Sequence, residues 1–195
     1  EVLSNLVTGD YTLSVNSVTT QGVTYSFNNG QSQTVTVLEG QTLSVNIDYT
    51  APVTATGVIT GFGSVYINGV KFETDQAVVT ANGETDTEDA LEIGMVVTIN
   101  GNIGADGDGA EASSIEYQAS AEGPVTGINL AEKTITLLGQ VYFIDDLTEF
   151  DDVTFDAIQI GNWVEISAIE NSDDQYIATR IELSDSSEEY QLVGE

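Results

Sequence analysis

The chain has 195 residues, 41% of them hydrophobic, which is enough for one large domain or for two to three small ones with a buried core. Three basic residues stand against 32 acidic ones, so the formal net charge is −29. A field of this sign repels nucleic-acid phosphates and anionic membranes, and it attracts divalent cations. The sequence contains no Cys and no His, which excludes disulfides, zinc–thiolate sites and the usual His-dependent catalytic triads.

No apolar run is long enough to span a membrane, so we expect neither membrane insertion nor a nucleic-acid partner. Dense acidic charge keeps a protein soluble in high salt, where screening removes the self-repulsion. The composition therefore favours saline or calcium-rich surroundings. Because the sequence opens on Glu1 without a signal peptide, we expect a mature or excised product.

Residues 1–52 alternate apolar and polar side chains in short segments, which is typical of half-buried strands. The pattern L-x-x-G-D-Y-T-L-S-V, followed by T-V-T-V-x-x-G-Q-T-L-S-V-N-I, resembles the secreted prealbumin-like or carboxypeptidase-regulatory-like β-sandwich. A sandwich of that kind has about seven strands. Fewer are predicted here, so either strands are missing or a neighbouring module completes the sheet. The predicted strands are Tyr11–Asn16, Val23–Phe27, Thr34–Leu38 and Leu43–Tyr49.

Residues 53–119 and 120–185 are predicted to be two copies of one unit, because three anchor segments recur at a nearly constant spacing. Each copy is about 65 residues long, with five or six short strands and a Leu-x-x-Gly or Ile-x-x-Gly turn. That size favours a small closed or partly open barrel of the OB type. The anchors are Gly57–Gly61 with Gly123–Gly127, Leu91–Val97 with Ile158–Val164, and Ala112–Glu116 with Ala178–Glu182, at offsets of 66, 67 and 66.

The first copy opens with G-V-I-T-G-F-G-S-V-Y-I-N-G-V-K-F at Gly57–Phe72, in which Asn-Gly is a strong hairpin signal. This segment, with L-E-I-G-M-V-V-T-I and A-S-S-I-E, resembles the bacterial secreted family known as domain of unknown function 5666. The resemblance covers residues 55–185 in two copies and is close in the first. The second departs from it where the G-F-G-S-V turn becomes Ile128–Ala131. The resemblance implies a β-barrel module of exported or surface proteins, and it implies no activity or site residues.

The best candidate for a metal site is an acidic, glycine-rich loop that ends the first copy's long strand. Asp106, Asp108 and Glu111 offer the hard oxygen ligands that Ca²⁺ prefers, and two glycines permit a tight backbone. The loop falls short of an EF-hand because the remaining ligand positions are absent. The alternative is a solvated acidic hairpin. No cofactor is required by the sequence, and Ca²⁺ is the one that this pattern allows.

Other chemistry-bearing residues have simpler explanations. The acidic clusters at residues 84–89 and 145–152 are typical of solvated loops. With 32 acidic residues some close carboxylate pair is inevitable, so we expect no enzyme. Aromatic side chains can stack on sugar rings, but at strand positions they usually pack in a core. The aromatic candidates are Phe62, Tyr66, Tyr142, Trp163 and Tyr176.

We expect an all-β protein with an N-terminal β-sandwich-like unit followed by two small OB-like β-barrels in tandem. Residues 186–195 are an acidic tail or the start of a further strand. The expected role is a non-enzymatic structural or interaction module of a bacterial surface or secreted protein, from a marine or saline environment. Expected partners are other copies of the chain, neighbouring modules or surface glycans. Self-assembly by strand donation is one form of this role, and a calcium-dependent carbohydrate-binding or adhesion module is the alternative.

Overall fold

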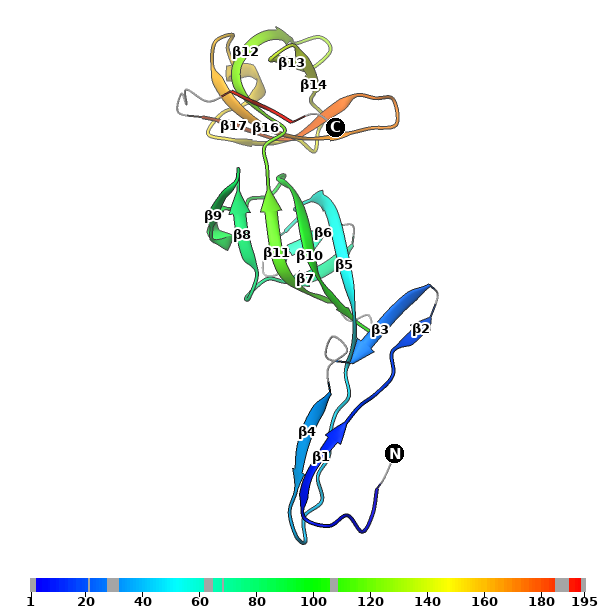
Figure 1. Ribbon diagram of the computed structural model, residues 1–195. Helices are drawn as coiled ribbons and strands as arrows, with labels where there is room; N and C mark the ends of the chain where they lie inside the picture. The colour runs from blue at the N-terminus through cyan, green and yellow to red at the C-terminus, as the bar shows by residue number, and fades with distance from the viewer. Residues whose placement is uncertain are drawn as a thin grey trace. The chain divides into compact units, whose positions relative to one another are not determined.

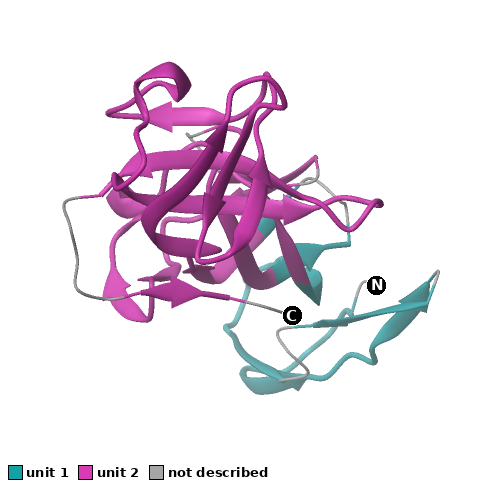
Figure 2. Cartoon of the chain, turned by 90° about the horizontal axis from the view of Figure 1, so that it is seen from above, with its two compact units in different colours: residues 1–53, 102–110 teal, residues 54–101, 111–195 magenta. Residues whose placement is uncertain are grey.

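The computed structural model describes residues 3–20, 22–27, 32–61, 65–67, 69–105, 109–184 and 190–193 (Figure 1). Their regular elements are strands, apart from the short 3-10 helices η2 (Glu88–Ala90) and η3 (Phe155–Ala157). The all-β class is thus confirmed. Within these ranges no helix is both long and apolar enough to cross a bilayer. The chain divides into two compact units, residues 1–53 with 102–110 and residues 54–101 with 111–195 (Figure 2).

Unit 1, residues 1–53 and 102–110, is made of narrow strand pairs with almost no core. The strands β1 and β4 form an antiparallel two-stranded sheet (Figure 1). The strands β2 and β3 form a hairpin, and the end of β3 pairs in the antiparallel sense with the start of β5. Among its described residues only Phe27, Ala51 and Ala110 are buried. Its strands are β1 (Gly9–Leu13), β2 (Val18–Thr20), β3 (Val23–Phe27), β4 (Gln33–Val37) and the first residues of β5 (Tyr49–Val58).

One predicted strand in this unit is wrong. The segment Leu43–Tyr49 was expected to be a strand, but residues 41–48 have no strand pairing and β5 begins only at Tyr49. Alternation of apolar and polar side chains indicates which face would be buried, whereas a strand also needs a neighbour to accept its hydrogen bonds. No described strand pairs with this segment, and Leu43 stays 52% exposed.

The first barrel lies in unit 2 and follows the strand order β5-β10-β11-β7-β6, with β8 added in parallel to β11. The predicted hairpin is present, since Val65 pairs with Phe72 and Ile67 with Val70. Residues 62–64 and 68, which include the predicted turn residues, lie outside the described ranges. The strands are β6 (Val65–Ile67), β7 (Val70–Glu73), β8 (Val78–Ala81), β9 (Glu84–Asp86), β10 (Val96–Gly104) and β11 (Ala110–Tyr117).

The second barrel is closed. Its strands pair in the order β13-β14-β17-β16-β12, and β12 pairs back with β13, so that no free edge remains in this ring. Counted along the chain, β14 is the third strand of this ring and β17 is the fifth. These two strands run parallel, as the Greek-key connection of an OB-type barrel requires. The strands are β12 (Ala121–Asn129), β13 (Thr134–Leu137), β14 (Gln140–Phe143), β15 (Glu149–Asp151), β16 (Trp163–Glu170), β17 (Tyr176–Leu183) and β18 (Gln191–Leu192).

The two barrels share a strand order and one distinctive turn. In the first barrel the Ile59 N–H donates to the Met95 carbonyl at 2.9 Å, and the Gly94 N–H donates to the Ile59 carbonyl at 3.0 Å. These bonds fix the turn that enters the fourth strand of the ring, and the glycine there has φ +90°. The two barrels therefore have the same strand order and the same hydrogen-bonded turn, while a duplication of one unit stays a prediction. The counterparts of these bonds, both 2.8 Å, join Val125 to Asn162 and Gly161.

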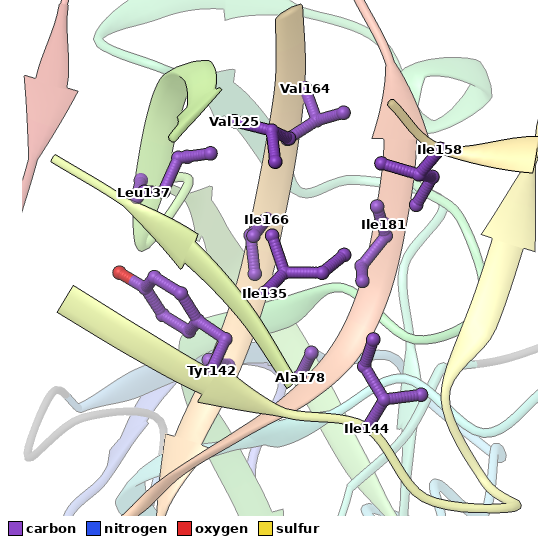
Figure 3. Close-up of a cluster of buried hydrophobic side chains, with 12 residues drawn as sticks. Val125, Ile135, Leu137, Tyr142, Ile144, Ile158, Val164, Ile166, Ala178 and Ile181 are labelled. Carbon is purple, nitrogen blue, oxygen red and sulfur yellow. The ribbon is translucent and has the colours of Figure 1, made fainter. Parts of the chain in front are cut away.

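A dry core fills the second barrel. Alternate residues of β16 point inward, so Val164 and Ile166 are fully buried while their neighbours face outward. Figure 3 shows side chains from all five strands of the ring converging on one another. Besides these two, the cluster holds Ala121, Val125, Ile135, Leu137, Tyr142, Ile144, Ile158, Ala168, Ala178 and Ile181.

The alternation along β16 leads to a matched test. Truncating the fully buried Ile166 to Ala leaves a cavity and should lower the free energy of unfolding by about 2–5 kcal/mol. Ile169→Ala, on the same strand but at a position 41% exposed, should cost about 1 kcal/mol or less. Urea denaturation followed by Trp163 fluorescence measures both. Equal losses for the two variants would contradict the inward assignment of Ile166.

Candidate functional site

The most unusual side chain of the molecule is Arg180, one of three basic residues in the sequence and the only buried one among the described residues. It lies on β17 next to a β-bulge. Ser167 pairs with Arg180 and Ala168 with Ala178, which leaves Thr179 as the extra residue. Bulges re-aim the side chains beside them. Only 7% of the Arg180 side chain is exposed.

Arg180 joins the two barrels. Its guanidinium donates to the carboxylates of Glu92, of Asp151 at 2.5 Å and of Glu182 at 3.4 Å, and to the carbonyl of Ile93 at 3.4 Å. Glu92 and Ile93 come from the turn of the first barrel, whereas both other acids belong to the second. Removing one partner of a buried ion pair costs about 3–5 kcal/mol. The cost here is smaller because the three carboxylates are 38–44% exposed.

Gly94 brings the turn of the first barrel into direct contact with β17. A Cβ at this position would lie 2.6 Å from the Thr179 carbonyl oxygen and 3.0 Å from the Arg180 Cβ. Such distances leave room only for a hydrogen atom. The equivalent glycine of the second barrel, Gly161, has the same left-handed φ but nothing within 4 Å of a built Cβ. The close approach is thus particular to the first turn.

A second polar contact lies beside the linker between the barrels. The buried Tyr117 hydroxyl donates to Glu165 at 2.5 Å and lies 3.1 Å from the Ser167 hydroxyl. The Asn82 amide donates to the other oxygen of Glu165 at 3.0 Å and accepts the Ala119 N–H at 2.9 Å. Burial raises the pKa of Tyr117 well above its usual value, so the phenol stays a proton donor. Together with Arg180, these groups make the interface between the barrels polar and fully specified in geometry.

The carboxylates around Arg180 are held in an unfavourable environment. Burial raises the pKa of Glu92 and of Glu182, and in both cases this outweighs the lowering by the Arg180 guanidinium. Neighbouring acids, Asp151 among them, raise both values further. One cation facing three acids is a stabilising device with surplus negative charge.

The predicted calcium ligands are only partly visible. Asp106 and Asp108 lie outside the described residues. Glu111 is on β11 and its side chain is exposed to solvent. In the part of the chain that the structure describes, no three acidic side chains are grouped so that they could hold a metal ion. Calcium binding by this loop stays a prediction.

The other predicted candidates are mostly structural. Asp145 accepts the Leu147 N–H at 2.8 Å, and thereby caps its own turn. Tyr142 is buried in the second barrel, where burial raises its pKa to about 12. The remaining aromatic positions divide as follows: Tyr142 packs on Tyr176 at 6.0 Å, Trp163 packs on Tyr190 at 5.0 Å, Tyr66 is 42% exposed, and Phe62 lies outside the described residues.

Sequence reasoning missed the Arg180 cluster, although a signal existed. In the aligned copies Arg180 takes the place of Ser114, and Glu92 takes the place of Gln159. Glu92 in the first copy and Arg180 in the second are opposite charges, and each has a neutral counterpart in the other copy. Such a complementary pair suggests a contact between the copies. The spacing alone could not show it, because a polar residue at an outward strand position is normally solvated.

Gly94 and Gly161 form a matched pair for testing the interface. Ala at either position should cost roughly 1 kcal/mol for the left-handed backbone. Gly94→Ala should cost a further 1–3 kcal/mol or so, because its Cβ collides with the Thr179 carbonyl. Thermal and urea unfolding of the two variants measure the difference. Equal destabilisation would show that the barrels do not meet at Gly94.

The raised pKa values of Glu92 and Glu182 determine a pH dependence. Folded carboxyls that bind protons more tightly than unfolded ones add stability that is complete below the unfolded value of 4.5. This stability is lost as the pH rises through the raised folded values. The melting temperature should therefore rise as the pH falls through the raised folded pKa values toward the unfolded value of 4.5.

The double variant Glu92→Gln, Glu182→Gln should flatten this rise, as followed by calorimetry. Glu111→Gln with Glu116→Gln removes the same charge from exposed positions on β11 and serves as the control. An equal flattening in the control would assign the pH dependence to net charge instead of to the Arg180 cluster.

Comparison with known proteins follows the boundaries of the second barrel. Residues 122–182 match the family model described as Domain of unknown function (DUF5666), which confirms that part of the resemblance. The resemblances of the first barrel and of residues 1–52 stay predictions. No curated protein matches the sequence. A solved structure described as "drosophila Unr CSD456" is 12% identical over 93% of this chain and 98% of that chain, and its TM-score of 0.25 is too low to support an argument. The chain is thus similar to the DUF5666 family over its second barrel.

Proposed function

We propose that this chain is a non-enzymatic structural or interaction module of a bacterial surface or secreted protein, and that it associates with further copies or neighbouring modules. One observation carries the proposal. Unit 1 buries only Phe27, Ala51 and Ala110 among its described residues, so it cannot stabilise its strands by itself. Isolated two-stranded sheets are marginal in water and gain stability when another sheet or strand covers them.

Exposed aliphatic side chains support association through unit 1. They lie in the segments that adjoin β1 and β4 in the chain, on the β2–β3 hairpin and along the unpaired segment 41–48. Unpaired strand edges are templates for pairing with another chain. The exposed set comprises Leu3, Leu6, Val7, Val18, Val23, Leu38, Leu43 and Ile47, at 40–75% exposure.

Unit 2 suits a load-bearing role. Two barrels held by one buried guanidinium and a fixed polar contact form a single compact unit without disulfides. The family match over the second barrel and the acidic composition favour an exported protein in saline surroundings. We also propose that residues 54–117 are a second, diverged copy of the same family, because the strand order and the turn hydrogen bonds recur there.

Strand donation by the C-terminus would first require the predicted spare strand to leave a pairing that it already makes. The predicted spare strand is β18, which pairs in the antiparallel sense with β12 through Leu192–Ala121 and Gln191–Glu122. It therefore belongs to its own barrel. A donated C-terminal strand must first leave β12, so we place the acceptor in unit 1 and the donor in a second copy or a neighbouring module.

Hydrogen exchange tests this proposal. Amides of β1, β4 and residues 41–48 should exchange fast in dilute protein and gain protection as the concentration rises toward about 1 mM. Leu43→Asp with Ile47→Asp should abolish the gain, because charge on the exposed apolar face opposes pairing. Leu130→Asp with Leu147→Asp, at exposed loop positions of unit 2, is the matched control. Protection that is independent of concentration would overturn the proposal.

A further inference from the structure

The contact between the barrels is heterologous: it uses a turn of the first barrel and a strand face of the second. The turn Leu91–Met95 meets β17 and β15, where the built Cβ of Gly94 lies close to Arg180 and Glu149. Each barrel contains both kinds of surface, because the two barrels share one strand order. One turn and one strand face are therefore left without a barrel against them.

The unused turn is Ile158–Asn162 of the second barrel. It makes the same hydrogen bonds to Val125 as the first turn makes to Ile59. Yet nothing lies within 4 Å of a Cβ built on Gly161, and Ile160 at its tip is 69% exposed. An exposed isoleucine on a rigid turn is a small apolar knob.

The unused strand face lies on the first barrel, at β8 and β11. Ser114 pairs with Val78 across these parallel strands just as Arg180 pairs with Glu149 across β17 and β15. Val78 is 58% exposed and Ser114 is half-buried. An exposed aliphatic side chain thus stands where the second barrel has an acid.

The turn and the strand face differ between the two barrels in a matched way: at one position of each, one barrel has a charged residue and the other has a neutral one. In the contact within the chain, Glu92 on the turn faces Arg180 on the strand. In the unused pair of surfaces the equivalent residues are Gln159 and Ser114, which are both neutral. One exposed acid remains beside Ser114 on the strand face, because Glu116 takes the place of Glu182.

The linker contact changes in the same way. Tyr117 of the first barrel binds Glu165 of the second. Leu183 and Thr98 occupy the equivalent positions on the unused surfaces, and Leu183 is 38% exposed. The acid and the phenol of this contact are thus both absent from the unused surfaces.

We propose that the turn Ile158–Asn162 of one copy docks on the β8–β11 face around Val78 and Ser114 of a second copy, in the geometry that the two barrels use within the chain. The proposal rests on the self-association proposed above, but it assigns a surface in unit 2 instead of unit 1. A heterologous contact of this kind extends head to tail, so the product is an open row of barrels or a ring. Because each copy carries a net charge of −29, association should strengthen with added salt.

Complementary charge variants of the full chain test the contact. Gln159→Glu and Ser114→Arg recreate, across two copies, the pair that Glu92 and Arg180 form within one. In sedimentation velocity at about 0.5 M salt and up to about 1 mM protein, the wild type should self-associate. The Gln159→Glu chain alone should associate about tenfold more weakly, whereas a mixture of Gln159→Glu and Ser114→Arg chains should form mixed dimers about tenfold more tightly than the wild type.

Ile160→Glu is the second variant, since its exposed position leaves the fold intact. The equivalent Ile93 is partly covered in the contact within the chain, at 42% exposed, so Ile160→Glu should weaken association. Association that is unchanged by Ile160→Glu but is lost in Leu43→Asp with Ile47→Asp would overturn this contact and leave the function proposed through unit 1 standing. A wild type that stays monomeric, with a mixture that also stays monomeric, would overturn both. Mixed dimers that persist in the unit 1 variant establish the contact independently.

Discussion

The cohesion of unit 2 depends on one buried guanidinium. Arg180 faces Glu92, Asp151 and Glu182, and only the first of these comes from the other barrel. The ion pair is effective because the bulge at Thr179 sets the carbonyl of that residue against Gly94, where a side chain would collide. The ion pair of Arg180 with Glu92 and the close contact of Gly94 with Thr179 therefore involve neighbouring residues of the same strand and the same turn. The contact of Tyr117 and Asn82 with Glu165 adds a second point at which the barrels meet.

This arrangement suits a chain with so few cations. All three of its basic side chains form ion pairs, and these pairs differ widely in their exposure to solvent. Lys71 and Lys133 make exposed pairs, which are worth little in solution. The buried Arg180 instead fixes geometry, and the surplus acid around it makes that geometry sensitive to protonation.

Much of the fold could be predicted from the sequence. The offsets of 66 and 67 residues identified two units that share a strand order, and the Leu-x-x-Gly and Ile-x-x-Gly segments became the same turn. The strand expected at Leu43–Tyr49 failed because alternation carries no information about a partner. The burial of Arg180 was missed for a related reason: what covers an outward-facing residue depends on another barrel. Local patterns thus predict the modules better than they predict the contacts between them.

The position of Arg180 has a consequence for proteolysis. Trypsin-like proteases cleave after Lys and Arg, and the sequence offers only Lys71, Lys133 and Arg180. The bond after Arg180 lies within β17, which is paired with strands on both sides, so it becomes accessible only when this strand unfolds locally. The residue that holds the structure together is thus also a concealed cleavage site. Hydrolysis there reports the local unfolding of β17.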